Sequence, residues 1–81
     1  MSDPMPKIVT VTNAADYGNH VAVRVGEYDT MPDIALRGAR KLRAFGAVYG
    51  VKKDVGIAHR FQVLGRPVAG LSPVVGHIWT Y

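Results

Sequence analysis

The feature that most constrains this chain is a single segment with helical periodicity, residues 30–46, among segments that have the period of a strand. At about 100° per residue, its apolar side chains fall on one arc; they are Met31, Ile34, Ala35, Ala39, Leu42 and Phe45. Gly38 lies on the same arc, where it indicates close approach to a neighbouring element. An apolar helix stripe must be buried against a second layer. Since no second helix is predicted, that layer has to be a sheet.

The predicted helix has signals at both ends. Thr30 and Asp33 have the spacing of a capping box, with Asp in the place of Glu. Pro32 falls in the first turn, where its missing N–H costs little. We therefore expect the helix to begin near Met31, and we expect Gly46 to end it as a left-handed C-cap.

Strand patterns account for most of the remaining chain. The clearest is 20–25, where valines alternate with other residues, as in a half-buried antiparallel strand. Together the predicted strands are 7–12, 20–25, 47–52, 56–64 and 74–81. The first two should form a hairpin with a moderately long loop, 13–19, and a tight polar turn should follow the third.

This order predicts an α+β fold, an antiparallel sheet of four to five strands with one amphipathic helix packed on one face (β-β-α-β-β-β). With 81 residues the chain has room for one small domain, which we place at 7–81. Residues 1–6, with two prolines, are expected to be a flexible lead-in.

Composition limits the function classes. The chain has no cysteine, so it can form neither a disulfide nor a thiolate metal site. The chain start lacks a basic region followed by an apolar block, and no apolar run reaches the roughly 20 residues of a membrane span. We therefore expect a cytoplasmic protein that does not bind membranes.

Charge is unevenly distributed along the sequence. The formal net charge is +4, but residues 1–33 sum to −3 and residues 34–81 sum to +7, with Asp54 the single acid in the second part. Such an uneven distribution of charge gives information about binding partners rather than about the fold. It favours an anionic partner for the second part of the chain.

The basic side of the predicted helix is the main candidate binding surface, because guanidinium groups donate two parallel hydrogen bonds to phosphates and carboxylates. An idle, solvated helix face is the alternative. The absence of an acidic residue among these side chains, where i,i+4 pairs would stabilise an idle helix, favours binding. The candidate contact row is Arg37, Arg40, Lys41 and Arg43, extended by Lys52, Lys53 and Arg60.

Other chemistry is expected to be absent. His20, His59 and His77 are not at the spacing of metal ligands, so we expect no metal site. The two serines, Ser2 and Ser72, have no base or orienting group in an evident arrangement, and we expect neither catalysis nor a cofactor.

Aromatic residues on the predicted strands have two interpretations. Tyr49, Phe61, Trp79 and Tyr81 could stack on bases, as in binders of single-stranded nucleic acid, but a core of this size needs most of its aromatics. Core packing is the preferred interpretation for Phe61. Tyr17 and Tyr28 are alternative interface anchors, because Tyr is enriched at binding hot spots.

In size, in its one helix on an antiparallel sheet, in its lack of cysteine and in its lopsided charge, the chain resembles small phage-encoded anti-CRISPR proteins that act on type I (Cascade) complexes. The resemblance implies a non-enzymatic inhibitor, active in the bacterial host cytosol, that binds the surveillance complex and blocks recognition of target DNA. The first alternative is a module that binds nucleic acid directly through the basic helix face. The second is a phage accessory or structural subunit that assembles through edge strands. We expect a monomer or a weak dimer.

Overall fold

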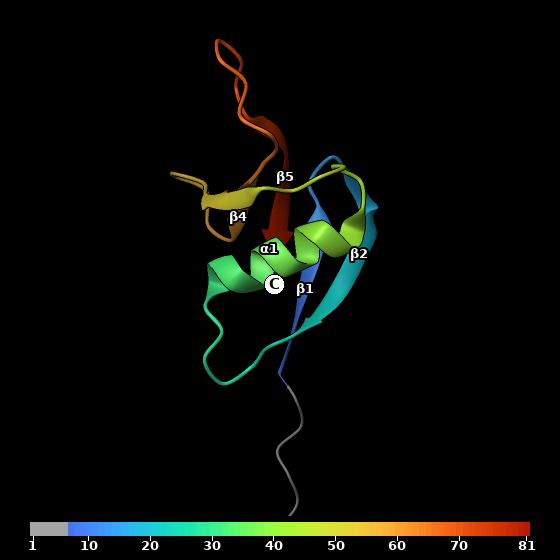
Figure 1. Cartoon of the computed structure of the whole chain (residues 1–81). Coiled ribbons are helices and arrows are strands. Elements are labelled where there is room, and N and C mark those ends of the chain that lie inside the picture. Colours follow the sequence, from blue (N-terminus) through green and yellow to red (C-terminus); the bar gives the residue numbers. More distant parts are fainter. Residues whose placement is uncertain (1–6) are drawn as a thin grey trace, which may run out of the picture.

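A computed structural model describes residues 7–81, and it has one helix on a five-stranded sheet (Figure 1). The elements in chain order are β1 (Ile8–Asn13), β2 (Asp16–Arg24), α1 (Met31–Leu42), β3 (Gly50–Lys53), β4 (Arg60–Leu64) and β5 (Val74–Thr80). The predicted α+β class and the element order are confirmed. The expected lead-in, 1–6, lies outside the described residues.

The sheet is antiparallel throughout, in the order β2-β1-β5-β4-β3. β5 is therefore the central strand, between the hairpin β1–β2 and the hairpin β3–β4. The chain passes from one edge strand, β2, to the other, β3, and α1 lies in this crossover. The helix crosses one face of the sheet and contacts all five strands.

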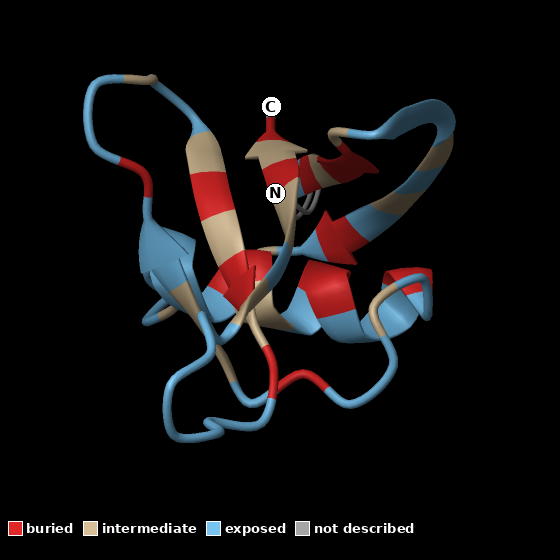
Figure 2. Cartoon of the chain, turned by 90° about the horizontal axis from the view of Figure 1, so that it is seen from above, coloured by how far each residue is buried: buried red, intermediate tan, exposed pale blue. Residues whose placement is uncertain are grey.

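The core fills the space between α1 and the sheet, where the buried residues of both layers meet (Figure 2). The strand residues are Val9, Val11, Val23, Phe61, Val63 and Ile78, and the helix contributes Ile34, Ala35, Ala39 and Leu42. Because strand side chains alternate between faces, the residues between these positions lie on the other side of the sheet. We call that side the uncovered face.

Gly38 faces Val11 at the centre of this core. A Cβ at Gly38 would lie 2.5 Å from Cβ and 2.8 Å from Cγ1 of Val11, and nearer still to Cγ2. Real Cβ atoms do not come this close to other atoms, so α1 can sit at its present distance from β1 only with glycine here. The close approach expected from the sequence is confirmed.

The first hairpin differs from the prediction of a long loop. Its turn consists of Ala14 and Ala15 alone, and β2 begins at Asp16. The side chain of Asn13 accepts a hydrogen bond from the Ala15 N–H at 3.0 Å, which closes the turn locally. The polar residues 17–19 form an irregularity in the β1–β2 register, where Thr12 pairs with His20 but Asn13 pairs with Asp16.

The helix starts where predicted, at Met31, but its last residue is Leu42 and its left-handed C-cap is Arg43 instead of Gly46. At its start the Thr30 N–H donates to Oδ2 of Asp33 at 3.1 Å. At its end Arg43 takes the left-handed conformation, with φ of 60°. Phe45 leaves the helix and packs over Gly76 of β5, where a Cβ would lie 2.8 Å from its Cδ1.

Two predicted strands are shorter than expected. β3 begins at Gly50 instead of 47, and β4 begins at Arg60 instead of 56. His59, which the alternation placed on the strand, has φ of 63° and belongs to the turn. A left-handed residue cannot continue a strand, so the loop 54–59 is longer than the tight turn that was predicted.

Candidate functional site

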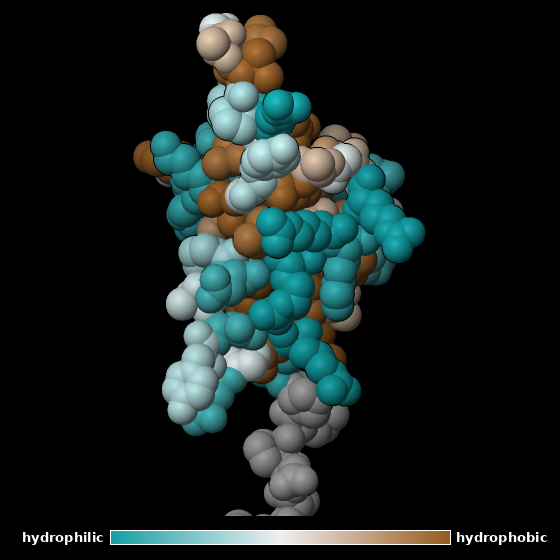
Figure 3. Space-filling view, in the orientation of Figure 1, coloured by the Kyte–Doolittle hydropathy of each residue, from teal (hydrophilic) through white to brown (hydrophobic). Residues whose placement is uncertain are grey.

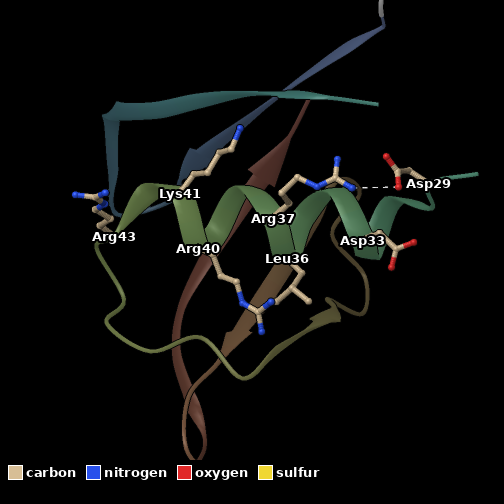
Figure 4. A pocket seen from close by; sticks show the side chains of 7 residues that line it. All are labelled: Asp29, Asp33, Leu36, Arg37, Arg40, Lys41 and Arg43. Carbon is tan, nitrogen blue, oxygen red and sulfur yellow. Dashed lines mark hydrogen bonds and ion pairs between the residues drawn. The ribbon is translucent and has the colours of Figure 1, made fainter. Parts of the chain in front are cut away.

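The solvent side of α1 forms a shallow groove of about 610 Å³ (Figure 4). Hydrophilic side chains gather over the helix on this face of the molecule (Figure 3). The groove is lined by Asp29, Asp33, Leu36, Arg37, Arg40, Lys41 and Arg43. The structure thus brings together the four basic residues predicted on the helix, because three- and four-residue spacing puts them on one side.

Arg37 is neutralised by a carboxylate of the same chain, contrary to the expectation of an unpaired row. Its Nη2 donates to Oδ1 of Asp29 at 3.1 Å, and its Nη1 donates to the backbone carbonyl of Arg24 at 2.8 Å. Asp29 also accepts from the Gly26 N–H at 2.6 Å. That backbone hydrogen bond, and then the Arg37 guanidinium, hold the pKa of Asp29 below its ordinary value of 3.8. Arg37 therefore anchors the loop between β2 and α1.

Arg40 has a different partner. Its Nε and Nη2 donate to the backbone carbonyl of Val48, at 3.3 and 3.2 Å. These bonds hold the segment between α1 and β3 against the helix and fix the direction of the guanidinium plane. A carbonyl carries no net charge, so Arg40 keeps its positive charge in the groove.

Lys41 and Arg43 complete the basic end of the groove. The ion pairs found within residues 7–81 involve Arg37, Arg60 and His77, and neither Lys41 nor Arg43 takes part in them. Both side chains are exposed. We call Arg40, Lys41 and Arg43 the helix patch.

The backbone at Arg43 is unusual for its position. Helices often end with a left-handed residue, and glycine is preferred there because any Cβ is strained. This chain has an arginine at that position, with φ of 60°. Strained non-glycine residues of this kind cluster at functional sites. The Arg43 side chain also lies where the helix dipole favours positive charge.

The other three predicted contact residues do not extend the helix patch. Lys52 pairs with Gln62 of β4, and Gln62 and Arg60 alternate with the buried Phe61 and Val63, so both cations lie on the uncovered face, on the opposite side of the sheet from α1. Lys53 is on the helix side, but its Nζ donates to the Ile57 carbonyl at 3.1 Å and lies 5.6 Å from the Phe61 ring. The sequence could not show this separation, because it follows from strand register.

The uncovered face carries a second cluster. Arg60 donates from Nε to Oδ2 of Asp54, and the Nε2 of His77 lies 3.9 Å from the same oxygen. The Arg60 guanidinium also lies 5.8 Å from the centre of the Trp79 ring. Asp54, although on this face, is only 9% exposed, and Arg60 compensates its charge.

The predicted aromatic set is divided by the fold. Phe61 is in the core, as preferred from the sequence, and Tyr49 lies in the segment before β3. Trp79 and Tyr81 both lie on the uncovered face of the central strand. Tyr17 and Tyr28 are exposed, at 67% and 90%.

Comparison with known proteins identifies neither a family nor a function for this chain. No family model matches this chain. No curated protein and no solved structure matches it either. Within residues 7–81 no three metal-ligating side chains come together, and no helix is long and apolar enough to cross a membrane. A functional assignment therefore depends on the two surfaces described above.

The residue that sequence reasoning missed is Asp29. The sequence shows it as one acid in the first, acidic part, eight residues before Arg37, with no periodic relation to it. Only the turn at 26–29 brings its carboxylate to the helix face, where it removes one of the four predicted contact residues from the unpaired set.

Proposed function

We propose that this chain is a small non-enzymatic binding protein whose helix patch contacts an anionic surface of a macromolecular partner. The observation that carries the proposal is Arg43, an unpaired cation in a backbone conformation that glycine would adopt with less strain. Lys41 and Arg40 stand beside it on the same groove.

The two ends of the groove carry opposite charges, and the positive end suits contact with an anionic surface. Asp29 and Asp33 lie towards the start of α1, and the helix patch lies towards its end (Figure 4). Arg40 is held in place by two hydrogen bonds, so its remaining donors are oriented before a partner arrives. Fixing a side chain in advance lowers the entropic cost of binding.

For the partner, we propose the type I CRISPR surveillance complex, on the basis of the resemblance in size, architecture and charge to anti-CRISPR proteins. The chain would act in the bacterial cytosol by occupying a surface needed for recognition of target DNA. Guanidinium groups bind both carboxylates and phosphates, and the proposal assigns the helix patch to acidic protein side chains of that complex.

The test uses the double variant Lys41→Glu, Arg43→Glu and a matched control, Lys7→Glu, Arg66→Glu, which makes the same charge change outside the groove. Each protein is mixed with purified type I surveillance complex, and co-elution and target-duplex binding are measured. We expect the wild type and the control to co-elute with the complex and to block duplex binding, and the helix-patch variant to do neither.

Two outcomes would overturn the proposal. If the wild type does not co-elute, the complex is not the partner. If the wild type alone retards the free target duplex and the helix-patch variant does not, the helix patch binds nucleic acid directly, and the chain is the nucleic-acid module of the first alternative.

A further inference from the structure

We propose that the uncovered face of the sheet is a second binding surface, on which bases of single-stranded nucleic acid stack against Trp79 and Tyr81. This surface lies on the other side of the sheet from α1 and the helix patch. The inference does not depend on the proposed function, since it uses different residues.

The two aromatic side chains are placed by the central strand. Trp79 lies on β5, and Tyr81 continues its ladder, because the Tyr81 N–H donates to the Thr10 carbonyl at 2.9 Å and the Thr10 N–H donates back to it at 3.1 Å. Residues two apart on a strand share a face and are about 7 Å apart. Binders of single strands use aromatic side chains on an open sheet in this way.

The neighbours of Tyr81 leave room for a ligand, whereas the Arg60 guanidinium already lies 5.8 Å from the centre of the Trp79 ring. In register, Trp79 is flanked by Thr12 on β1 and by Arg60 on β4, and Tyr81 is flanked by Thr10 on β1. The Tyr81 side chain is 68% exposed. A base that stacks on Tyr81 therefore meets the small Thr10 side chain directly opposite on β1, with Ile8 two residues further along that strand.

The charge of the face suits phosphates. Arg24 on β2 and Lys52 on β3 lie at the two edges, and Arg60 lies between them on β4. Asp54, the acid that lies with them, is paired with Arg60. The face therefore has one uncompensated cation on each side of the central aromatic pair. Single-strand binding uses such an arrangement of cations and stacking rings.

The same charges argue against a second copy of the chain as the occupant. Packing two uncovered faces against each other would bring the uncompensated Arg24 and Lys52 of both copies into one buried interface. Like charges held together in an interface oppose association. An anionic ligand with aromatic bases uses both the cations and the rings.

Trp79 adds an independent observation. Its Nε1 is buried and has no hydrogen-bond acceptor among residues 7–81. Buried donors are nearly always paired, so an unpaired one requires an explanation. An acceptor supplied by a bound nucleotide, after a small movement of the ring, would pair this donor.

The test uses the single tryptophan of the chain, whose fluorescence reports on Trp79 alone. Oligo(dT) and oligo(U) are titrated into the full chain at low salt, with a duplex of the same length as the comparison. We expect single strands to quench the fluorescence with saturation and the duplex to quench it much less. Because stacking a base contributes strongly to affinity, Tyr81→Ala should weaken single-strand binding about tenfold or more.

A second arm identifies the cations that bind phosphates. The logarithm of affinity should fall with the logarithm of salt concentration. Arg24→Gln, Lys52→Gln should make that slope shallower by about 1.4, because each phosphate that a cation neutralises on a single strand contributes about 0.7. The helix-patch variant Lys41→Gln, Arg43→Gln, which makes the same change in net charge, is the matched control, and it should leave the quenching nearly unchanged.

Three results would overturn the inference. The first is absence of quenching by either oligonucleotide with the wild type. The second is an unchanged affinity in Tyr81→Ala, provided that its circular dichroism spectrum is that of the wild type. The third is concentration-dependent dimerisation that the Tyr81→Ala exchange abolishes, which would assign the face to a second copy.

Discussion

Gly38→Ala is the exchange for which helix propensity and tertiary packing predict opposite effects on stability. In an isolated helix, alanine is more favourable than glycine by about 1 kcal/mol. Here the new methyl group would lie 2.5 Å from Cβ and 2.8 Å from Cγ1 of Val11, which is fully buried. Overpacking of a core costs about 1–3 kcal/mol. We therefore expect Gly38→Ala to lower the free energy of unfolding by about 1–2 kcal/mol.

A double-variant cycle with Val11→Ala tests the cause of this loss. Val11→Ala removes Cγ1 and Cγ2, two of the three atoms that the new methyl group would meet, and leaves the Cβ of residue 11 in place. Its own cost is about 2 kcal/mol for the buried methyl groups it deletes. In that background, Gly38→Ala should cost less than in the wild type, because the contacts with Cγ1 and Cγ2 are gone and only the contact with the Cβ of residue 11 opposes the gain in helix propensity. Urea unfolding followed by circular dichroism gives all four free energies.

The matched control is Gly50→Ala, at a glycine with no atom within 4 Å of an added Cβ. It should change the stability by less than about 0.5 kcal/mol. If Gly38→Ala instead stabilises the wild-type protein, or if its cost is the same with and without Val11, the close approach of α1 to β1 does not exist and the reasoning is refuted.

Three further predictions concern the ends of the helix. Leu42→Ala, at a side chain that is 7% exposed, should cost about 2–5 kcal/mol and should unfold a large fraction of so small a domain at 37 °C. Arg43→Gly should leave the melting temperature unchanged or raise it, with a gain of up to about 1 kcal/mol, while it weakens partner binding. Because the pKa of Asp29 is held low, its carboxylate stabilises the fold above its ordinary value of 3.8 and loses this effect as the pH falls through the lowered pKa. Asp29→Asn should therefore make the loss of stability below about pH 4 shallower.

Each of these has a contrary result. A cost below about 1 kcal/mol for Leu42→Ala would mean that the end of α1 is not packed on the sheet. A large loss of stability in Arg43→Gly would assign Arg43 a structural role. If Asp29→Asn loses stability at low pH as steeply as the wild type does, neither the Gly26 N–H nor Arg37 holds the carboxylate in solution.

Local sequence patterns predicted the fold class and the element order, since both depend on interactions between near neighbours. The apolar arc of residues 31–42 and the Thr30–Asp33 spacing placed the helix start at Met31, as found. The alternation of valines in 20–25 placed part of β2. The left-handed C-cap was predicted three residues too late, at Gly46 instead of Arg43, because Phe45 fits the apolar arc but packs over Gly76 of a distant strand.

The candidate site was predicted only in part. Arg37, Arg40, Lys41 and Arg43 do share one groove, since helix periodicity alone decides that. The separation of Lys52 and Arg60 from this groove depends on strand register. The pairing of Arg37 depends on a turn that brings Asp29 to the helix.

By itself, then, the order of residues determined that one helix would lie on an antiparallel sheet, because hydrophobic periodicity acts over a few residues. Tertiary structure decided which cations remain unpaired, and it put Trp79 and Tyr81 on the open side of the central strand. Both outcomes depend on contacts between residues far apart in the chain. Those contacts form only when the five strands take one order and one register.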